Sequence, residues 1–274
     1  MDHFEAYLNN YDNLKKTIIY DFELEFSGGI GDCIKFFLHA LYICMHNNIK
    51  LYYLKNNIEL EKLLRLKYDK LYISLDKNIH KMIEIKNESE IKTILDDTYY
   101  SIKPAVFWGE LFIYDKLTKI PFENFFYFSN DVITNSNRLL TKIGLNNTSY
   151  SSIHIRLGDK FLETDSAYKT CPNDIRYFSE EKLNNFISNN TDKTFILFTD
   201  NKEYKLKIKN NHTYINILDT HIGHTALTNT TYQQILDAIS EFYILANSEK
   251  IFITAYSGFS VIASKFKKIA LIML

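Results

Sequence analysis

Residues 154–159, His-Ile-Arg-Leu-Gly-Asp, place His154, Arg156 and Asp159 at the end of an apolar run that begins at Ser151. In an open α/β sheet, ligands bind beyond the carboxyl ends of the strands, which is where this segment would lie. Residues two apart on a strand point to one face, so His154 and Arg156 share a face. Burying such a pair without an anion nearby is costly, so the segment predicts an anion-binding site. The alternative is a structural pair of Arg156 with Asp159, with His154 filling space.

Two predicted strand-to-helix junctions also carry residue types suited to anion binding. The first is Ser27-Gly28-Gly29-Ile30-Gly31-Asp32, whose glycines let the backbone turn sharply and point amide N–H groups at a phosphate. The second brings Ser257, Gly258, Phe259 and Ser260 to a helix start, where hydroxyls and backbone amides are available. Neither matches a dinucleotide fingerprint or a P-loop. A plain turn and simple N-capping by Ser257 are the alternatives.

These segments need a frame of strands and helices to position them. Apolar runs predict strands, and apolar residues spaced three and four apart predict helices. Strands are predicted over 17–26, 50–54, 70–74, 151–157, 194–199, 213–217, 250–254 and 269–274. Helices are predicted over 59–66, 134–143 and 203–209, and after Gly31, Ser179, Thr231 and Ser257. This alternation predicts an α/β protein with parallel strands.

A polar, turn-prone stretch at residues 144–149 interrupts the pattern. It predicts a boundary between two domains, residues 1–148 and 149–274. Both halves read as Rossmann-like, and two such domains facing across a cleft are the layout of many enzymes that use nucleotide sugars.

The composition narrows the class of protein. The 274 residues carry 32 Lys+Arg and 33 Asp+Glu, a net charge of −1, which argues against a protein that coats nucleic acid. Three cysteines without ligand spacing favour a reducing compartment and no disulfide framework. We recognise no targeting or transmembrane segment, so a cytoplasmic location is expected, with peripheral membrane association left open. His221 and His224 favour a solvated loop over a metal site, since no third ligand is evident.

The same segments resemble the fucosyltransferase superfamily, which includes α-1,2, α-1,6 and protein O-fucosyltransferases. Residues 154–159 look like its His-x-Arg-x-x-Asp motif, most similar to the HIRRGD of bacterial-type α-1,2 enzymes. Residues 27–53 resemble the opening glycine loop and helix, residues 196–201 (ILFTDN) a strand-ending Ser/Thr-Asp segment, and residues 244–266 the closing segment. Two departures are Asp32-Cys33, where the family has Asn-Gln, and Leu157, where it has a second arginine.

The resemblance implies a GT-B-like fold, GDP-fucose as donor, a glycan acceptor, inversion at the anomeric carbon, and no metal or other cofactor. Arg156 would hold the β-phosphate, His154 would stand beside the nucleotide or acceptor, and either Asp237 or Glu241 would match an acidic residue near the nucleotide. The implied donor-binding residues are Gly28, Gly29, His154, Arg156, Asp159, Thr199, Asp237, Glu241, Ser257, Gly258, Phe259 and Ser260.

Sugar transfer leaves a diphosphate that gains charge, and a fixed guanidinium with backbone N–H groups can stabilise it. A carboxylate can take the acceptor proton, and Glu163 or Asp165, in the loop after the motif, is the expected base. Arg156, Glu163 and Asp165 are thus the predicted catalytic residues. Two alternatives stay open: a heptosyltransferase-like enzyme that uses ADP-heptose, which the Gly-Gly-Ile-Gly-Asp loop also resembles, and a non-catalytic protein of the same fold that binds a nucleotide or glycan.

Overall fold

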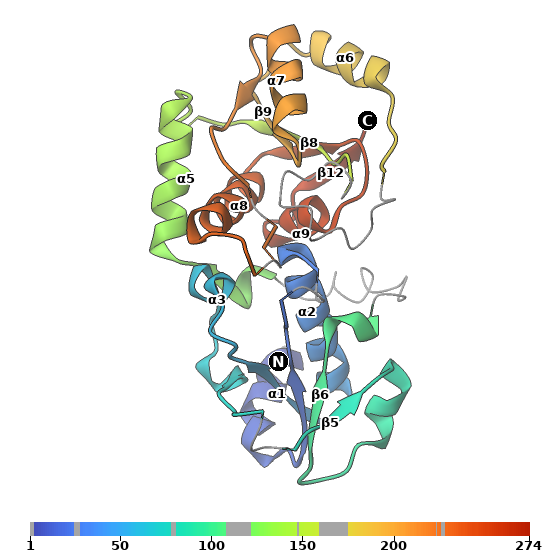
Figure 1. The fold of residues 1–274 in the computed structure, drawn as a ribbon. Helices are drawn as coiled ribbons and strands as arrows, with labels where there is room; N and C mark the ends of the chain where they lie inside the picture. Colours follow the sequence, from blue (N-terminus) through green and yellow to red (C-terminus); the bar gives the residue numbers. More distant parts are fainter. Residues whose placement is uncertain are drawn as a thin grey trace. The chain divides into compact units, whose positions relative to one another are not determined.

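The computed structural model describes residues 3–24, 28–77, 81–107, 122–146, 148–158, 175–222, 224–225 and 228–274. The chain divides into two compact units, residues 1–127 and 128–274. Each holds a five-stranded sheet (Figure 1). The division falls after Tyr127 and not after residue 148, because helix α5 (Asn130–Lys142) packs along α8 (Tyr232–Leu245) of the second unit.

The first unit is a parallel sheet with strand order β4-β2-β1-β6-β5, and every described pairing in it is parallel. Helix α2 packs against β1 and β2. The elements are α1 (His3–Asn10), β1 (Lys16–Tyr20), α2 (Ile30–His46), β2 (Ile49–Leu54), α3 (Glu59–Leu63), β3 (Leu64–Leu66), β4 (Tyr72–Ile73), β5 (Ile83–Ile85), β6 (Tyr99–Ile102) and β7 (Phe126–Phe128), with short 3-10 turns at 11–13, 69–71, 88–93, 104–107 and 122–124.

Three sequence predictions for this unit are wrong. The predicted strand over 70–74 is reduced to β4, because residues 69–71 form a 3-10 turn. Strand β1 ends at Tyr20 and does not run to residue 26, because Asp21 is buried and bonded to the Asn56 amide and the Lys77 ammonium. The predicted helix over 59–66 ends at Leu63, and its last three residues pair with β7 as strand β3.

The second unit is a parallel sheet with strand order β10-β9-β8-β11-β12. Its strands alternate with helices along the chain, as the sequence predicts. After α5 the elements are β8 (Ser151–Ile155), α6 (Glu180–Ser188), β9 (Phe195–Thr199), α7 (Lys202–Asn211), β10 (Asn216–Ile217), α8 (Tyr232–Leu245), β11 (Lys250–Ile253), α9 (Gly258–Phe266) and β12 (Ala270–Met273).

The helices of this unit begin where short polar side chains can cap them. The Ser179 hydroxyl accepts the Lys182 N–H at the start of α6, and Thr231 and Gln234 form a complete capping box at the start of α8. Both helices begin where the sequence predicts them, directly after Ser179 and Thr231.

The central strands are buried on both faces, and this determines where His154 points. Ile153 and Ile155 belong to the apolar cluster that includes residues of α6 and α7. Side chains alternate along a strand, so His154 lies on the opposite face, where its ring stacks on Phe259 of α9 at a centroid distance of 5.7 Å. In the described ranges, each helix is either too short or too polar to span a bilayer.

Candidate anion-binding site

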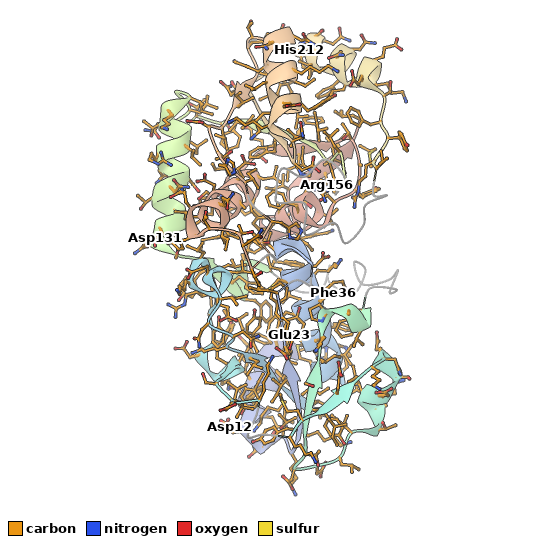
Figure 2. All side chains as sticks on the ribbon, viewed as in Figure 1. Asp12, Glu23, Phe36, Asp131, Arg156 and His212 are labelled. Atoms are coloured by element: carbon orange, nitrogen blue, oxygen red, sulfur yellow. The ribbon has the colours of Figure 1, made fainter. Side chains whose placement is uncertain are left out.

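The topology of the second sheet locates the site. Counted along the chain, its strand order is 3-2-1-4-5, so the order reverses between β8 and β11. In doubly wound sheets ligands bind in the crevice at this reversal, beyond the carboxyl ends of the strands. Arg156 follows β8 here, and Ser257 follows β11 and opens α9. Figure 2 labels Arg156 in this unit.

Arg156 is held by an anion from its own chain. Its Nη1 donates to Oδ2 of Asp200 at 2.6 Å, and the two side chains are 15% and 7% exposed. The predicted need for an anionic partner is therefore met within the protein, by Asp200. The alternative pair with Asp159 lies outside the described residues.

Asp200 also fixes the backbone that follows β8. Its Oδ1 accepts the Leu157 N–H at 2.9 Å and its Oδ2 accepts the Gly158 N–H at 3.1 Å. Gly158 has φ +114°, a conformation that side-chain-bearing residues rarely adopt. Thr199, buried at the end of β9, donates its hydroxyl to Oδ1. The sequence prediction named Thr199 and missed Asp200, although a Thr-Asp pair ending a buried strand beside β8 was the available signal.

His154 lies behind this loop as a neutral imidazole. The residue is 5% exposed, and its Nδ1 is buried with no hydrogen-bond partner in the described part of the chain. Burial lowers the pKa of His154 from 6.5 to about 4; the Asp200 carboxylate opposes this shift, and two nearby guanidinium groups add to it. An imidazole that stays neutral near pH 7 offers one donor and one acceptor.

The N-terminus of α9 is the second anion-favouring group at this edge. Ser257 caps the helix by accepting the Phe259 N–H at 3.3 Å, as the alternative interpretation of this segment expected, and its contact with a phosphate stays a prediction. Ser260 is fully buried and donates to the Ser257 carbonyl at 3.4 Å, so it supports the turn from inside. A capped helix start still presents partial positive charge to an anion.

A second arginine, Arg176, contacts the backbone that follows β8 and β11, and the sequence prediction did not include it. The backbone N–H of Arg176 donates to the Leu157 carbonyl at 2.9 Å, and its guanidinium donates to the Tyr256 carbonyl. No local pattern marks Arg176, because its partners lie far away in the sequence.

The two carboxylates predicted near the nucleotide are buried among protein groups. Asp237 accepts from the Asn135 amide at 3.1 Å and from the His221 backbone N–H at 3.2 Å. Glu241 pairs with Lys205 at 3.1 Å, and these side chains are 1% and 6% exposed. Both join α8 to neighbouring elements, and their contact with a nucleotide stays a prediction.

The glycine loop of the first unit already holds a carboxylate. Gly28 has φ +78°, and a Cβ there would collide with the Asp32 carboxylate. Asp32 lies in the first turn of α2, which Gly29 caps, and pairs with Lys35 at 2.7 Å. The Asp32 carboxylate therefore lies beside Gly28 at this helix start, and contact of Gly28 and Gly29 with a donor stays a prediction.

Three predicted residues, Asp159, Glu163 and Asp165, lie outside the described residues. Among the residues that are described, no group of three or more His, Cys, Asp or Glu side chains could hold a metal ion.

No protein-family model matches the chain, and no curated protein sequence matches it. Solved structures do resemble it. A mutant of Arabidopsis thaliana FUT1 in complex with GDP matches at 12% identity and TM-score 0.56, covering 100% of this chain and 75% of that one. NodZ α-1,6-fucosyltransferase co-crystallised with GDP matches at 9% sequence identity and TM-score 0.55, and the match covers 91% of this chain and 92% of that one. POFUT1 in complex with GDP-fucose matches at 7% sequence identity and TM-score 0.53, and the match covers 95% of this chain and 98% of that one.

At sequence identities this low, the structural similarity shows that the fold is shared. The chain has the GT-B-like α/β fold with two Rossmann-like units, so the predicted fold class is confirmed. The site in the second unit combines an oriented guanidinium, a helix start and a neutral imidazole at the switch point of the sheet. Such a site can bind an anionic group and stabilise negative charge that develops on it.

Proposed function

We propose that the chain is a glycosyltransferase that moves fucose from GDP-fucose to a glycan acceptor. The observation that carries the proposal is the position of Arg156, oriented by Asp200 at the switch point of the second sheet. The fold is shared with fucosyltransferases solved with GDP or GDP-fucose, which favours GDP-fucose among nucleotide sugars. The motif at 154–159 favours the bacterial-type α-1,2 group.

In this proposal the second unit binds the donor and the first unit takes the acceptor side. Arg156 and the N-terminus of α9 stabilise the departing diphosphate, so the transfer proceeds without a metal ion and with inversion. Glu163 or Asp165 removes the acceptor proton. The base can be identified by comparing Glu163→Gln with Asp165→Asn. The variant that lacks the base should lose kcat and retain GDP binding.

Ligand-induced stabilisation tests the donor. A ligand that binds only the native state at a hundred times its Kd raises the unfolding free energy by about 2.7 kcal/mol. We expect GDP and GDP-fucose to raise the melting temperature, and ADP and UDP-sugars to leave it unchanged. A rise in melting temperature with ADP alone would refute the proposal and favour the heptosyltransferase-like alternative.

Turnover then separates an enzyme from a binding protein. Release of GDP from GDP-fucose, with or without a glycan acceptor, is expected in the presence of EDTA. Arg156→Lys keeps a positive charge beside Asp200 but loses the planar fork, so we expect it to fold and to lose most GDP binding and turnover. Arg65→Ala, at an exposed position on β3, is the matched control and should behave as wild type. GDP binding without turnover on any acceptor would support the non-catalytic alternative.

A further inference from the structure

Charged side chains gather at the carboxyl edge of the first sheet. Counted along the chain, the strand order of this sheet is 3-2-1-5-4, so the order reverses between β1 and β6. Ligands of open α/β sheets bind beyond the carboxyl ends of the strands at such a reversal. Asp21 and Glu23 follow β1, and Lys103 directly follows β6. Figure 2 labels Glu23 in this unit.

A series of side-chain contacts connects the buried end of β1 to Lys103. Asp21, whose side chain is 4% exposed, accepts from the Asn56 amide at 3.0 Å and from the Lys77 ammonium at 2.7 Å. The same ammonium donates to Oε1 of Glu23 at 2.9 Å. Oε2 of Glu23 pairs with the Lys103 ammonium at 3.1 Å. Glu23 therefore orients the Lys103 ammonium, and the buried carboxylate of Asp21 fixes the other end of the series.

Stability gives little reason for this arrangement. The side chains of Glu23, Lys77 and Lys103 are 35–37% exposed, and ion pairs at such positions contribute little to the free energy of unfolding. Burying the Asp21 carboxylate has a desolvation cost, and the central strand β1 ends at Tyr20, just before it. Departures from local folding rules that bring no gain in stability are expected at functional sites.

The outer end of the series suits the hydroxyl groups of a sugar. The hydrogen bond to Glu23 raises the pKa of Lys103, against the opposing effect of burial, so this ammonium is charged at neutral pH. An ammonium has three N–H donors. In the described part of the chain, the Lys103 ammonium contacts Glu23 at 3.1 Å and Glu84 at 3.9 Å, and the second contact is too long for a hydrogen bond. The Lys103 ammonium can therefore also donate to a ligand oxygen.

We propose that Lys103 is an acceptor-binding residue, which donates to a hydroxyl oxygen of the glycan that receives fucose, and that Glu23 is its positioning residue. This inference rests on the proposed function, in which the first unit takes the acceptor side. Lys103 contacts the acceptor and Glu23 acts through Lys103, so substitution of either residue changes acceptor binding and leaves donor binding unchanged.

Steady-state kinetics of the full chain with GDP-fucose tests the proposal. The acceptor is the glycan that the wild-type chain fucosylates most strongly on an array of neutral and acidic glycans. Lys103→Met keeps the apolar stem and removes the donors, so we expect it to raise the KM of the acceptor by about tenfold and to change kcat and the Kd of GDP by less than about twofold. Lys16→Met, at a half-buried lysine that begins β1 at the opposite edge of the sheet, is the matched control and should behave as wild type.

The positioning role of Glu23 has a readout of its own. Glu23→Gln should raise the KM of the acceptor by about threefold in the wild-type background. It should add nothing in the Lys103→Met background, because its effect passes through Lys103. Equal rises of KM in the two backgrounds would refute the positioning role.

The outcomes separate this inference from the proposed function. An unchanged acceptor KM in Lys103→Met, or a rise in the Kd of GDP as large as the rise in KM, refutes the role of Lys103 while the proposed function stands. A wild-type chain that fucosylates no glycan of the array refutes the proposed function, and the role of Lys103 with it. If Lys103→Met does not fold, the acceptor KM and the Kd of GDP in Lys103→Gln decide in the same way.

Discussion

Asp200 holds the candidate site together, and Asp200→Asn is the substitution that tests this most directly. Oδ2 accepts both the Arg156 guanidinium at 2.6 Å and the Gly158 N–H, while Oδ1 accepts the Leu157 N–H. Asparagine has the same shape but only one acceptor oxygen. In either orientation, its NH2 group faces a donor that Asp200 now satisfies.

The size of the effect follows from burial and charge. Asp200 is 7% exposed and Arg156 is 15% exposed, so water compensates little for a lost contact. A hydrogen bond to a charged group contributes about 1.5–3 kcal/mol, and breaking a buried ion pair costs about 3–5 kcal/mol. We expect Asp200→Asn to lower the unfolding free energy by about 3 kcal/mol, which is a fall of about 6–12 °C in melting temperature for a chain of this size.

A double-mutant cycle is the measurement. Urea denaturation of Asp200→Asn, Arg156→Met and the double variant should give a coupling energy of about 1.5–3 kcal/mol between the two positions. The exposed pair Lys207–Glu180, at 2.9 Å with side chains 50% and 51% exposed, serves as control and should couple by less than about 1 kcal/mol. If the losses of unfolding free energy in the two single variants add up to the loss in the double variant, the argument that Asp200 orients Arg156 is refuted.

Three further predictions follow from other contacts. His154 has its pKa lowered to about 4 in the folded chain, so the unfolded chain takes up the proton first, and stability should fall by about 3 kcal/mol between pH 6.5 and pH 4. His154→Gln should remove that part of the pH dependence in denaturation curves, whereas the exposed control His221→Gln should keep it. Lys205→Met leaves the Glu241 carboxylate buried without its ammonium and should cost about 3–5 kcal/mol, while the double change with Glu241→Met should cost much less; equal losses would argue against a buried pair. Ser257→Ala should cost about 1 kcal/mol through loss of the α9 cap, and Ser257→Asp should restore stability yet weaken GDP binding, because it places negative charge where the phosphate is expected. Unchanged GDP affinity in Ser257→Asp would move the phosphate away from α9.

Most strands and helices of the second unit were predictable because their determinants are local, whereas β5, β6 and β7 of the structure were not predicted. Continuous apolar runs mark β8 and β9, which are buried on both faces, and helices begin directly after Ser179, Thr231 and Ser257, as the sequence predicts. The end of β1 was not predictable, because Asp21 looks like an exposed strand residue until Asn56 and Lys77 are brought to it.

The site was predictable only in part, for the same reason. Arg156 and Ser257 stand at strand ends that the apolar pattern locates. The partner of Arg156 is 44 residues away in the sequence, and the carbonyl that receives the Arg176 guanidinium is 80 residues away. Only the sheet order makes these groups neighbours, and that order depends on crossovers that one sequence does not encode locally.

The pairing of Arg156 with Asp200 has a consequence for how a chain of net charge −1 can bind a diphosphate. An arginine that must point in one direction needs a fixed acceptor, and a buried carboxylate provides that direction while cancelling the charge. Orientation and net positive charge must then come from different residues. The start of α9, capped by Ser257, is another group at this edge that favours an anion, through its partial positive charge.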